Sequence, residues 1–170
     1  MTDPPTRRLV VVRHSKTEPY ATTDHARTLT DRGRNDARAL GRWMVEQGIA
    51  VEVLLVSSAA RAVQTADLIV DEFGADAPDV MVMDDLYDAG AEEAIALCRE
   101  SLPESALCAA VVGHNPTMAS LADELAEPSH DEDLGHFPTS AAAVLDIDGG
   151  WADLEEGAAR LVTVFRPKER

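Results

Sequence analysis

Short apolar runs alternate along the chain with longer segments in which apolar residues recur every three or four positions. Each run has the length of a strand, and the runs cover residues 8–12, 53–56, 80–83, 107–112, 142–147 and 161–165. The helical spacing predicts helices over residues 34–47, 60–73, 92–102 and 117–126. Because the predicted strands alternate with predicted helices, we expect an α/β fold: a three-layer αβα sandwich around a mostly parallel central sheet.

Glycine and serine residues mark the ends of several of these elements. Gly48 and Gly74 follow two predicted helices and fit C-terminal stops. Ser57 and Ser58 follow the second strand, where their hydroxyl groups are expected to cap the next helix. Residues 107–112 form the most apolar run, which is typical of a central strand that is covered on both faces.

The length and composition predict one domain over residues 1–170. A chain of 170 residues can bury a core without disulfides. No apolar run can span a bilayer and the N-terminus lacks a signal-peptide pattern, so we expect a cytoplasmic protein with no membrane partner. Cys98 and Cys108 are isolated and no histidines cluster with them, so we expect two reduced thiols, no metal site and no cofactor.

The charge is strongly negative but unevenly distributed along the chain. A net charge of −16 argues against nucleic acid as a partner. Residues 1–66 nevertheless hold 10 Lys and Arg against 7 Asp and Glu, whereas residues 67–170 hold 5 against 24. A local basic site on an acidic body suits a small anionic group presented on a larger partner, although an acidic surface can also serve solubility alone.

Arginine and histidine residues lie where predicted strands end or the following helix begins. Arg13 and His14 follow the first strand, Arg61 lies near the start of the helix after the second, and His114 follows the fourth. Ligands in open α/β sheets bind outside the carboxyl ends of the strands, so these side chains are expected to converge. Arginine grips two phosphate oxygens at once, and a helix N-terminus near Arg61 adds backbone donors. The pattern therefore predicts a phosphoryl-group site.

A histidine beside two arginines is suited to attack phosphorus. The positive neighbours favour its neutral form, which carries a free lone pair. His14 is the candidate nucleophile because it directly follows Arg13 at the strand exit.

Three sequence blocks resemble the histidine phosphatase superfamily, which includes the cofactor-dependent phosphoglycerate mutases. They are Leu9-Val10-Val11-Val12-Arg13-His14-Ser15-Lys16-Thr17-Glu18, Ser57-Ser58-Ala59-Ala60-Arg61-Ala62-Val63-Gln64-Thr65-Ala66 and Val112-Gly113-His114-Asn115-Pro116. The short length and two further segments, residues 24–33 and 137–141, are most similar to SixA-type phosphohistidine phosphatases. The resemblance implies a phosphoglycerate mutase-like fold without a large cap insertion.

The resemblance also implies a role for each matching residue. His14 would be phosphorylated during turnover while Arg13, Arg61 and His114 hold the phosphate without a metal ion. Asp88 occupies the position of the acid that protonates the leaving group in larger relatives, although it can equally be one more solvated carboxylate. Ser15 replaces the usual glycine and either crowds the backbone or donates to phosphate. Further candidate substrate contacts are Lys16, Thr17, Arg27 and Asn115, with His25 near the mouth and Arg27 alternatively paired with Asp24.

The missing insertions favour a phosphorylated protein over a small substrate. An uncapped site has little to hold a sugar phosphate and more room for a phosphate on a protein, such as a histidine-containing phosphotransfer protein. The first hypothesis is therefore a metal-independent phosphohistidine phosphatase in signalling. The alternatives are a small-molecule phosphatase or mutase of the same superfamily, and a catalytically idle phosphate-binding module. The pairing of His14 with His114 argues against the last, since binding alone needs only the arginines.

Overall fold

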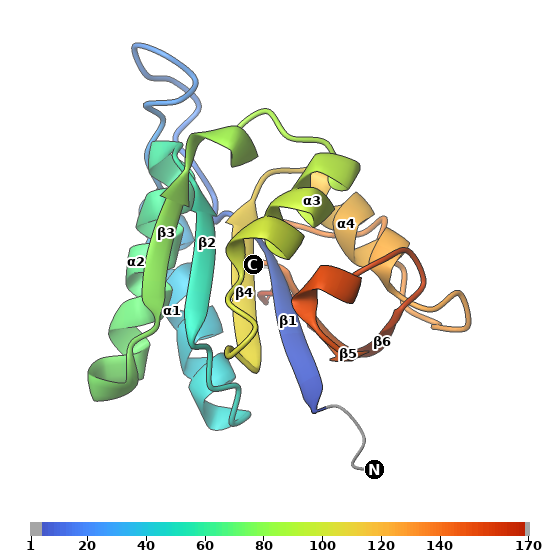
Figure 1. Ribbon diagram of the computed structural model, residues 1–170. Helices are drawn as coiled ribbons and strands as arrows, with labels where there is room; N and C mark the ends of the chain where they lie inside the picture. Colours follow the sequence, from blue (N-terminus) through green and yellow to red (C-terminus); the bar gives the residue numbers. More distant parts are fainter. Residues whose placement is uncertain (1–4, 169–170) are drawn as a thin grey trace.

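The chain folds around one six-stranded sheet, as the computed structural model of residues 5–168 shows (Figure 1). The strand order is β3-β2-β4-β1-β5-β6. The strands are β1 (Thr6–Arg13), β2 (Val53–Ser57), β3 (Asp79–Met83), β4 (Cys108–Gly113), β5 (Ala142–Asp148) and β6 (Ala159–Phe165). The helices are α1 (Asp31–Glu46), α2 (Ala60–Phe73), α3 (Ala91–Ser101) and α4 (Thr117–Leu125). Short 3₁₀ turns cover Gly74–Asp76, Asp84–Leu86 and Trp151–Asp153.

The sheet is parallel over β3, β2, β4 and β1, while β5 runs antiparallel to both of its neighbours. This mixed sheet confirms the predicted α/β class and its mostly parallel character. No large insertion separates the elements, and no described helix is both long and apolar enough to cross a membrane.

Successive side chains of the central strands point to opposite faces of the sheet, and this gives the fold two hydrophobic cores. In β1, Leu9 and Val11 pack with α3 and α4 on one face, while Val10 and Val12 pack with α1 and α2 on the other. All four residues are fully buried. Helices therefore cover both faces of the sheet, in agreement with the predicted three layers (Figure 1).

The carboxyl ends of β1, β4 and β2 lie side by side at one edge of the sheet. Arg13 pairs with Gly113 in the parallel register, and the backbone N–H of His14 donates to the carbonyl of Gly113 at 2.9 Å. Ser57 ends β2, which is the other neighbour of β4. The segments around His14 and His114 therefore lie next to each other.

Two local predictions need correction. Helix α1 begins at Asp31 instead of residue 34, because the side chain of Thr30 caps it by accepting from the backbone N–H of Gly33 at 3.0 Å. The predicted serine caps on α2 are wrong: Ala59 is the N-cap residue and no side chain caps this end. The hydroxyl groups of Ser57 and Ser58 instead bond to His114 and His25.

Gly33 keeps helix α1 against the segment that follows His14. A Cβ atom at this position would lie 2.1 Å from the backbone oxygen of Lys16, which already accepts from the backbone N–H of Thr30. A side chain here would push away the loop that leaves the end of β1.

We expect Gly33→Ala to lower the free energy of unfolding by about 1–3 kcal/mol, as overpacking does, when measured by urea denaturation. Gly90→Ala is the matched control, because the nearest atom to its added Cβ is 4.0 Å away. Equal stability losses in the two variants would contradict this account of Gly33.

Candidate active site

His14 lies at the buried end of the site with its ring held in one tautomer. Its side chain is buried, and Nδ1 lies 2.8 Å from the backbone oxygen of Ser15. Since a carbonyl oxygen only accepts, Nδ1 of the neutral ring carries the proton and Nε2 keeps its lone pair. The nitrogen that can attack phosphorus is therefore Nε2.

The surroundings of His14 keep the imidazole neutral. Burial, with smaller contributions from the charges of His114, Arg61 and Arg13, lowers the pKa of His14 to about 3, although the bond to Ser15 acts in the opposite direction. The three side chains that the sequence predicted to converge with His14 thus lie close enough to affect its pKa.

His114 faces His14 from the neighbouring strand end. The two ring centroids are 5.3 Å apart, and His114 Nε2 lies 2.8 Å from the hydroxyl oxygen of Ser57. Burial and the charge of Arg61 lower the pKa of His114 to about 4, while the carboxylates of Asp24 and Asp88 act in the opposite direction. Among residues 5–168, Nδ1 of His114 is buried without a hydrogen-bond partner, so it is available to a bound group.

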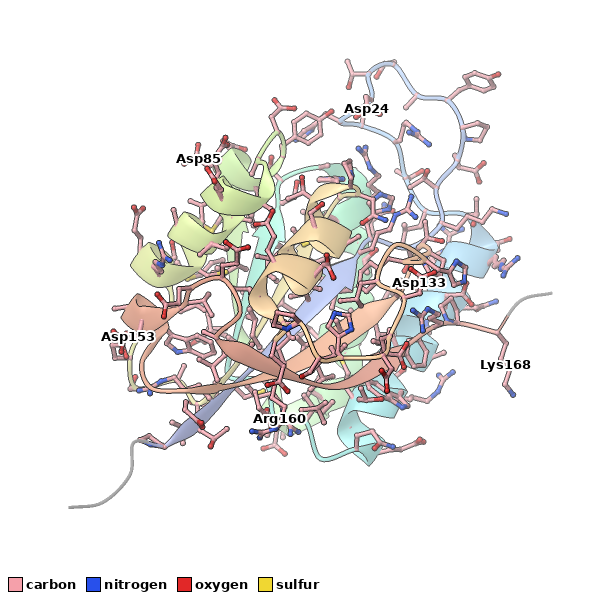
Figure 2. All side chains as sticks on the ribbon, turned by 90° about the vertical axis from the view of Figure 1, so that its right-hand side faces the viewer. Asp24, Asp85, Asp133, Asp153, Arg160 and Lys168 are labelled. Atoms are coloured by element: carbon pink, nitrogen blue, oxygen red, sulfur yellow. The ribbon has the colours of Figure 1, made fainter. Side chains whose placement is uncertain are left out.

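Arg61 is buried and is held by Asp24, which the sequence suggested only as a partner of Arg27. One terminal nitrogen donates to the backbone oxygen of Asp24 at 2.8 Å, and the other donates to its carboxylate at 3.0 Å. The hydroxyl of Tyr87 donates to the same carboxylate oxygen. Asp24 lies on the loop that projects beyond the sheet, at the same end of the molecule as Asp85 (Figure 2). Asp24 therefore connects this loop, helix α2 and the segment that follows β3.

Thr65 ties the segment after His14 to the helix that carries Arg61. Its hydroxyl accepts from the backbone N–H of Ser15 at 2.9 Å and donates to the backbone oxygen of Arg61 at 2.7 Å. This bridge fixes the nucleophile segment relative to α2.

Several of the other predicted site residues make hydrogen bonds within the protein. Arg13 donates to the backbone oxygen of Phe137 at 3.2 Å, and Asn115 donates to the same oxygen at 2.8 Å. The amide oxygen of Asn115 also accepts from the backbone of α4, so both ends of this side chain are used within the protein. Ser15 is fully buried, with its hydroxyl 2.5 Å from that of Ser140, and does not face the opening.

Arg27 holds the projecting loop together through hydrogen bonds to three of its residues. Arg27 donates to the hydroxyl of Thr17 at 2.6 Å, to the backbone of Glu18 at 2.9 Å and to the carboxylate of Asp24 at 3.2 Å. The alternative pairing with Asp24 is thus observed together with the contact to Thr17. Lys16 and Asp88 have exposed side chains, and Asp88 lies near enough to His114 to influence its pKa.

Sequence reasoning missed Asp24 as the partner of Arg61, Ser57 as the partner of His114, and Tyr87. Asp24 was predicted only as a partner of Arg27, and Tyr87 directly precedes the candidate acid Asp88. These were the only signals that the sequence carried for the two residues. The bonds of Asp24 to Arg61 and to Tyr87 join residues that are 37 and 63 positions apart in the chain.

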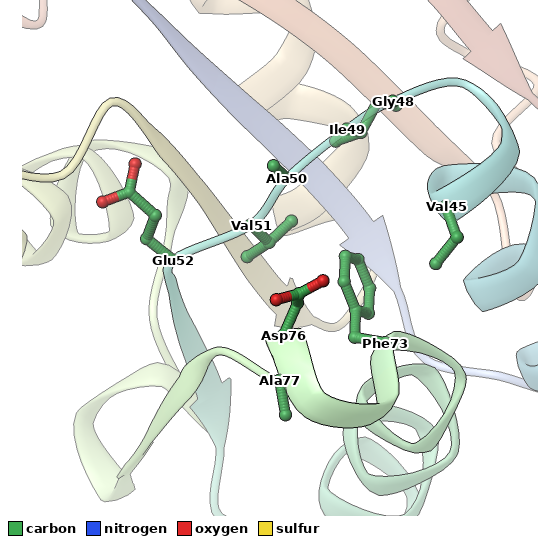
Figure 3. Close-up of a pocket in the computed structure, with 9 residues that line it drawn as sticks. All are labelled: Val45, Gly48, Ile49, Ala50, Val51, Glu52, Phe73, Asp76 and Ala77. Carbon is green, nitrogen blue, oxygen red and sulfur yellow. The ribbon is translucent and has the colours of Figure 1, made fainter.

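A separate hollow of about 470 Å³ lies at the opposite end of the sheet (Figure 3). It is lined by Val45, Gly48, Ile49, Ala50, Val51, Glu52, Phe73, Asp76 and Ala77. Its charged side chains are both acidic, so it repels phosphate. Among the described residues, no group of three or more His, Cys, Asp or Glu side chains is arranged to hold a metal ion.

The chain resembles known proteins over most of its length. The family model of the histidine phosphatase superfamily (branch 1) matches residues 9–91. The chain is 35% identical to the uncharacterised protein Rv1276c of Mycobacterium tuberculosis over 164 residues, which cover 92% of this chain and 100% of the relative.

Two solved structures share the fold. SixA from Nakamurella multipartitia is 34% identical with a TM-score of 0.87, and the match covers 98% of this chain and 99% of that one. The protein histidine phosphatase SixA complexed with tungstate is 25% identical with a TM-score of 0.78, over 92% of this chain and 95% of that one.

The low pKa of His14 predicts a loss of stability in acid. An unfolded histidine has a pKa of about 6.5, so the unfolded chain binds more protons than the folded chain between about pH 6.5 and 3. Stability is therefore lost as the pH falls through this window.

Between pH 7 and 4.5 we expect the wild type to lose about 2–3 kcal/mol more unfolding free energy than His14→Asn, measured by urea denaturation at both pH values. His136→Asn, which removes an exposed imidazole, controls for the loss of a histidine. Parallel pH profiles for the wild type and His14→Asn would show that His14 is not held neutral.

Proposed function

The chain belongs to the histidine phosphatase superfamily, in its SixA-type branch, and on that premise we propose that it hydrolyses phosphohistidine on a signalling protein through a covalent intermediate at His14. The observation that carries the proposal is the neutral, tautomer-fixed imidazole of His14 beside His114, Arg13 and Arg61. This arrangement supplies a nucleophile and fixed positive charge at one point.

The first chemical step is the transfer of the phosphoryl group to His14. Nε2 forms a bond to phosphorus while the bond from phosphorus to the leaving nitrogen breaks and its electron pair goes to that nitrogen. An imidazole that is already protonated leaves as the neutral base, and otherwise Asp88 supplies the proton. The positive charges of Arg13 and Arg61 neutralise the charge on the phosphoryl oxygens, and the neutral ring of His114 can donate a hydrogen bond to one of them.

The second step returns the enzyme to its starting state. Water attacks phosphorus and gives a proton to the carboxylate of Asp88, the bond from phosphorus to Nε2 breaks, and its electron pair returns to the nitrogen as inorganic phosphate departs. Because the arginines provide the positive charge, the reaction needs no metal ion. Tungstate is a tetrahedral oxyanion like phosphate, so the SixA relative that holds it supports an oxyanion site in this fold.

The nucleophile assignment predicts a metal-independent activity that depends on His14. We expect the purified protein to hydrolyse p-nitrophenyl phosphate in the presence of EDTA, and His14→Ala to abolish turnover with the fold retained. Rapid acid-free quenching with ³²P-labelled substrate should give an acid-labile, alkali-stable label on the wild type alone.

Two arginine variants separate the phosphate site from general charge effects. Arg61→Ala removes a buried guanidinium at the site and should lower kcat/KM by about 10²–10³. Arg42→Ala removes an exposed arginine of α1, which pairs with Glu72, and serves as the control. Activity that disappears with EDTA, or a fully active His14→Ala variant, would refute the mechanism.

The substrate proposal is tested by comparing phosphorylated groups at equal enzyme concentration. We expect a higher kcat/KM for a protein phosphorylated on histidine than for phosphoserine protein, a sugar phosphate or 3-phosphoglycerate. Phosphate release measured by a coupled assay compares all four. Faster turnover of 3-phosphoglycerate or the sugar phosphate would instead identify a small-molecule phosphatase.

A further inference from the structure

A row of aromatic rings leads from the buried nucleophile to the surface. The centroids of His14 and His114 are 5.3 Å apart, those of His114 and Tyr87 are 5.6 Å apart, and those of Tyr87 and His25 are 4.9 Å apart. Tyr87 meets both His114 and His25 edge to face, at interplanar angles of 88° and 73°. His14 is buried, Tyr87 is half-buried and His25 is exposed, so the row opens towards solvent.

One carboxylate fixes both the phosphate-binding arginine and the ring of Tyr87. Asp24 accepts from Arg61 and from the hydroxyl of Tyr87 with the same oxygen. The guanidinium carbon of Arg61 lies 5.9 Å from the centroid of the Tyr87 ring. The position of the ring is therefore coupled to the position of the phosphate group that Arg61 would bind.

The leaving group must lie on the Tyr87 side of the phosphate. In an in-line displacement the leaving atom is opposite the attacking atom. Since His14 Nε2 attacks from the buried end, the leaving group occupies the open end, where Tyr87 and His25 stand.

We propose that Tyr87 and His25 form a leaving-group subsite, and that Tyr87 is a specificity-determining residue that favours flat aromatic leaving groups such as the imidazole of phosphohistidine. This proposal rests on the function proposed above. Aromatic faces and edges attract another ring, and a phosphoimidazole ring that is protonated before the phosphorus–nitrogen bond breaks would gain a cation–π contact with Tyr87. The carboxylate of Asp24 lies beside the same ring and adds a counter-charge. An alkyl leaving group gains neither the ring contact nor the cation–π contact.

The test uses two small substrates that share a phosphorus–nitrogen bond and differ in the ring. Phosphoimidazole has an aromatic leaving group and phosphoramidate has none. We expect Tyr87→Leu to lower the ratio of kcat/KM for phosphoimidazole to kcat/KM for phosphoramidate by roughly three- to tenfold, the size of one aromatic contact. Tyr87→Phe keeps the ring, loses the bond to Asp24, and should retain most of the wild-type ratio.

Tyr20→Leu is the matched control, because Tyr20 is 88% exposed on the same projecting loop. This variant makes the same Tyr→Leu substitution outside the row of aromatic rings. It should leave the ratio of the two kcat/KM values unchanged. If Tyr87→Leu fails to fold by circular dichroism, His25→Ala removes the outer ring of the subsite and should lower the same ratio.

The possible results separate the two proposals. An equal loss of kcat/KM on both substrates would overturn the leaving-group subsite and leave Tyr87 as a support for Arg61, with the phosphatase mechanism intact. A wild-type protein that is inert on both substrates and on p-nitrophenyl phosphate would overturn the proposed function and the subsite with it.

Discussion

The parallel pairing of β1 with β4 is the constraint on which the site depends. The ladder continues one residue past β1, where the backbone N–H of His14 donates to the carbonyl of Gly113. This bond places His14 beside the residue that precedes His114. The backbone alone therefore brings the two histidine rings close together. Because Leu9–Val12 of β1 and all of β4 are buried and covered on both faces, the backbone at this point is held rigidly. A nucleophile built on a strand end can therefore be positioned more accurately than one on a free loop.

Burial of the site has an electrostatic consequence. Burial disfavours the charged form of His14 and His114, and the nearby positive charge of Arg61 adds to this effect, so both histidines stay neutral at physiological pH. For a nucleophile this is an advantage, because the lone pair is always available. Asp24 offsets part of the positive charge, and the bonds from Tyr87 and Arg61 hold the pKa of its carboxyl well below its usual range. Part of the positive charge at Arg61 is therefore already balanced within the protein before any phosphate binds.

Much of the fold was predictable because local patterns of apolar residues determine it. The apolar runs of β1 and β4 and the helical periodicity of α2 determine their elements without reference to the rest of the chain. The convergence of His14, Arg61 and His114 was also predictable, because parallel strands end at the same edge. The bonds of Ser57 and Thr65 were not, because the first depends on how the ends of β2 and β4 are placed and the second on how α2 packs against the segment after β1, which no local pattern encodes. Ser57 shows this directly: its hydroxyl, which was expected to cap α2, bonds to the half-buried imidazole of His114.

The small size of the chain constrains what it can recognise. In the proposed mechanism, the groups around a bound phosphate would be Arg13, Arg61 and His114, the loop braced by Arg27 and the ring of Tyr87. Arg13, Arg61 and His114 would contact only phosphate oxygens, so they would not discriminate between an ester and an amidate. Selectivity must therefore come from the first few atoms of the leaving group, where Tyr87 and His25 stand, and from contacts that a larger substrate makes beyond the rim. A small alkyl phosphate can use neither source, whereas a phosphorylated histidine on a protein can use both.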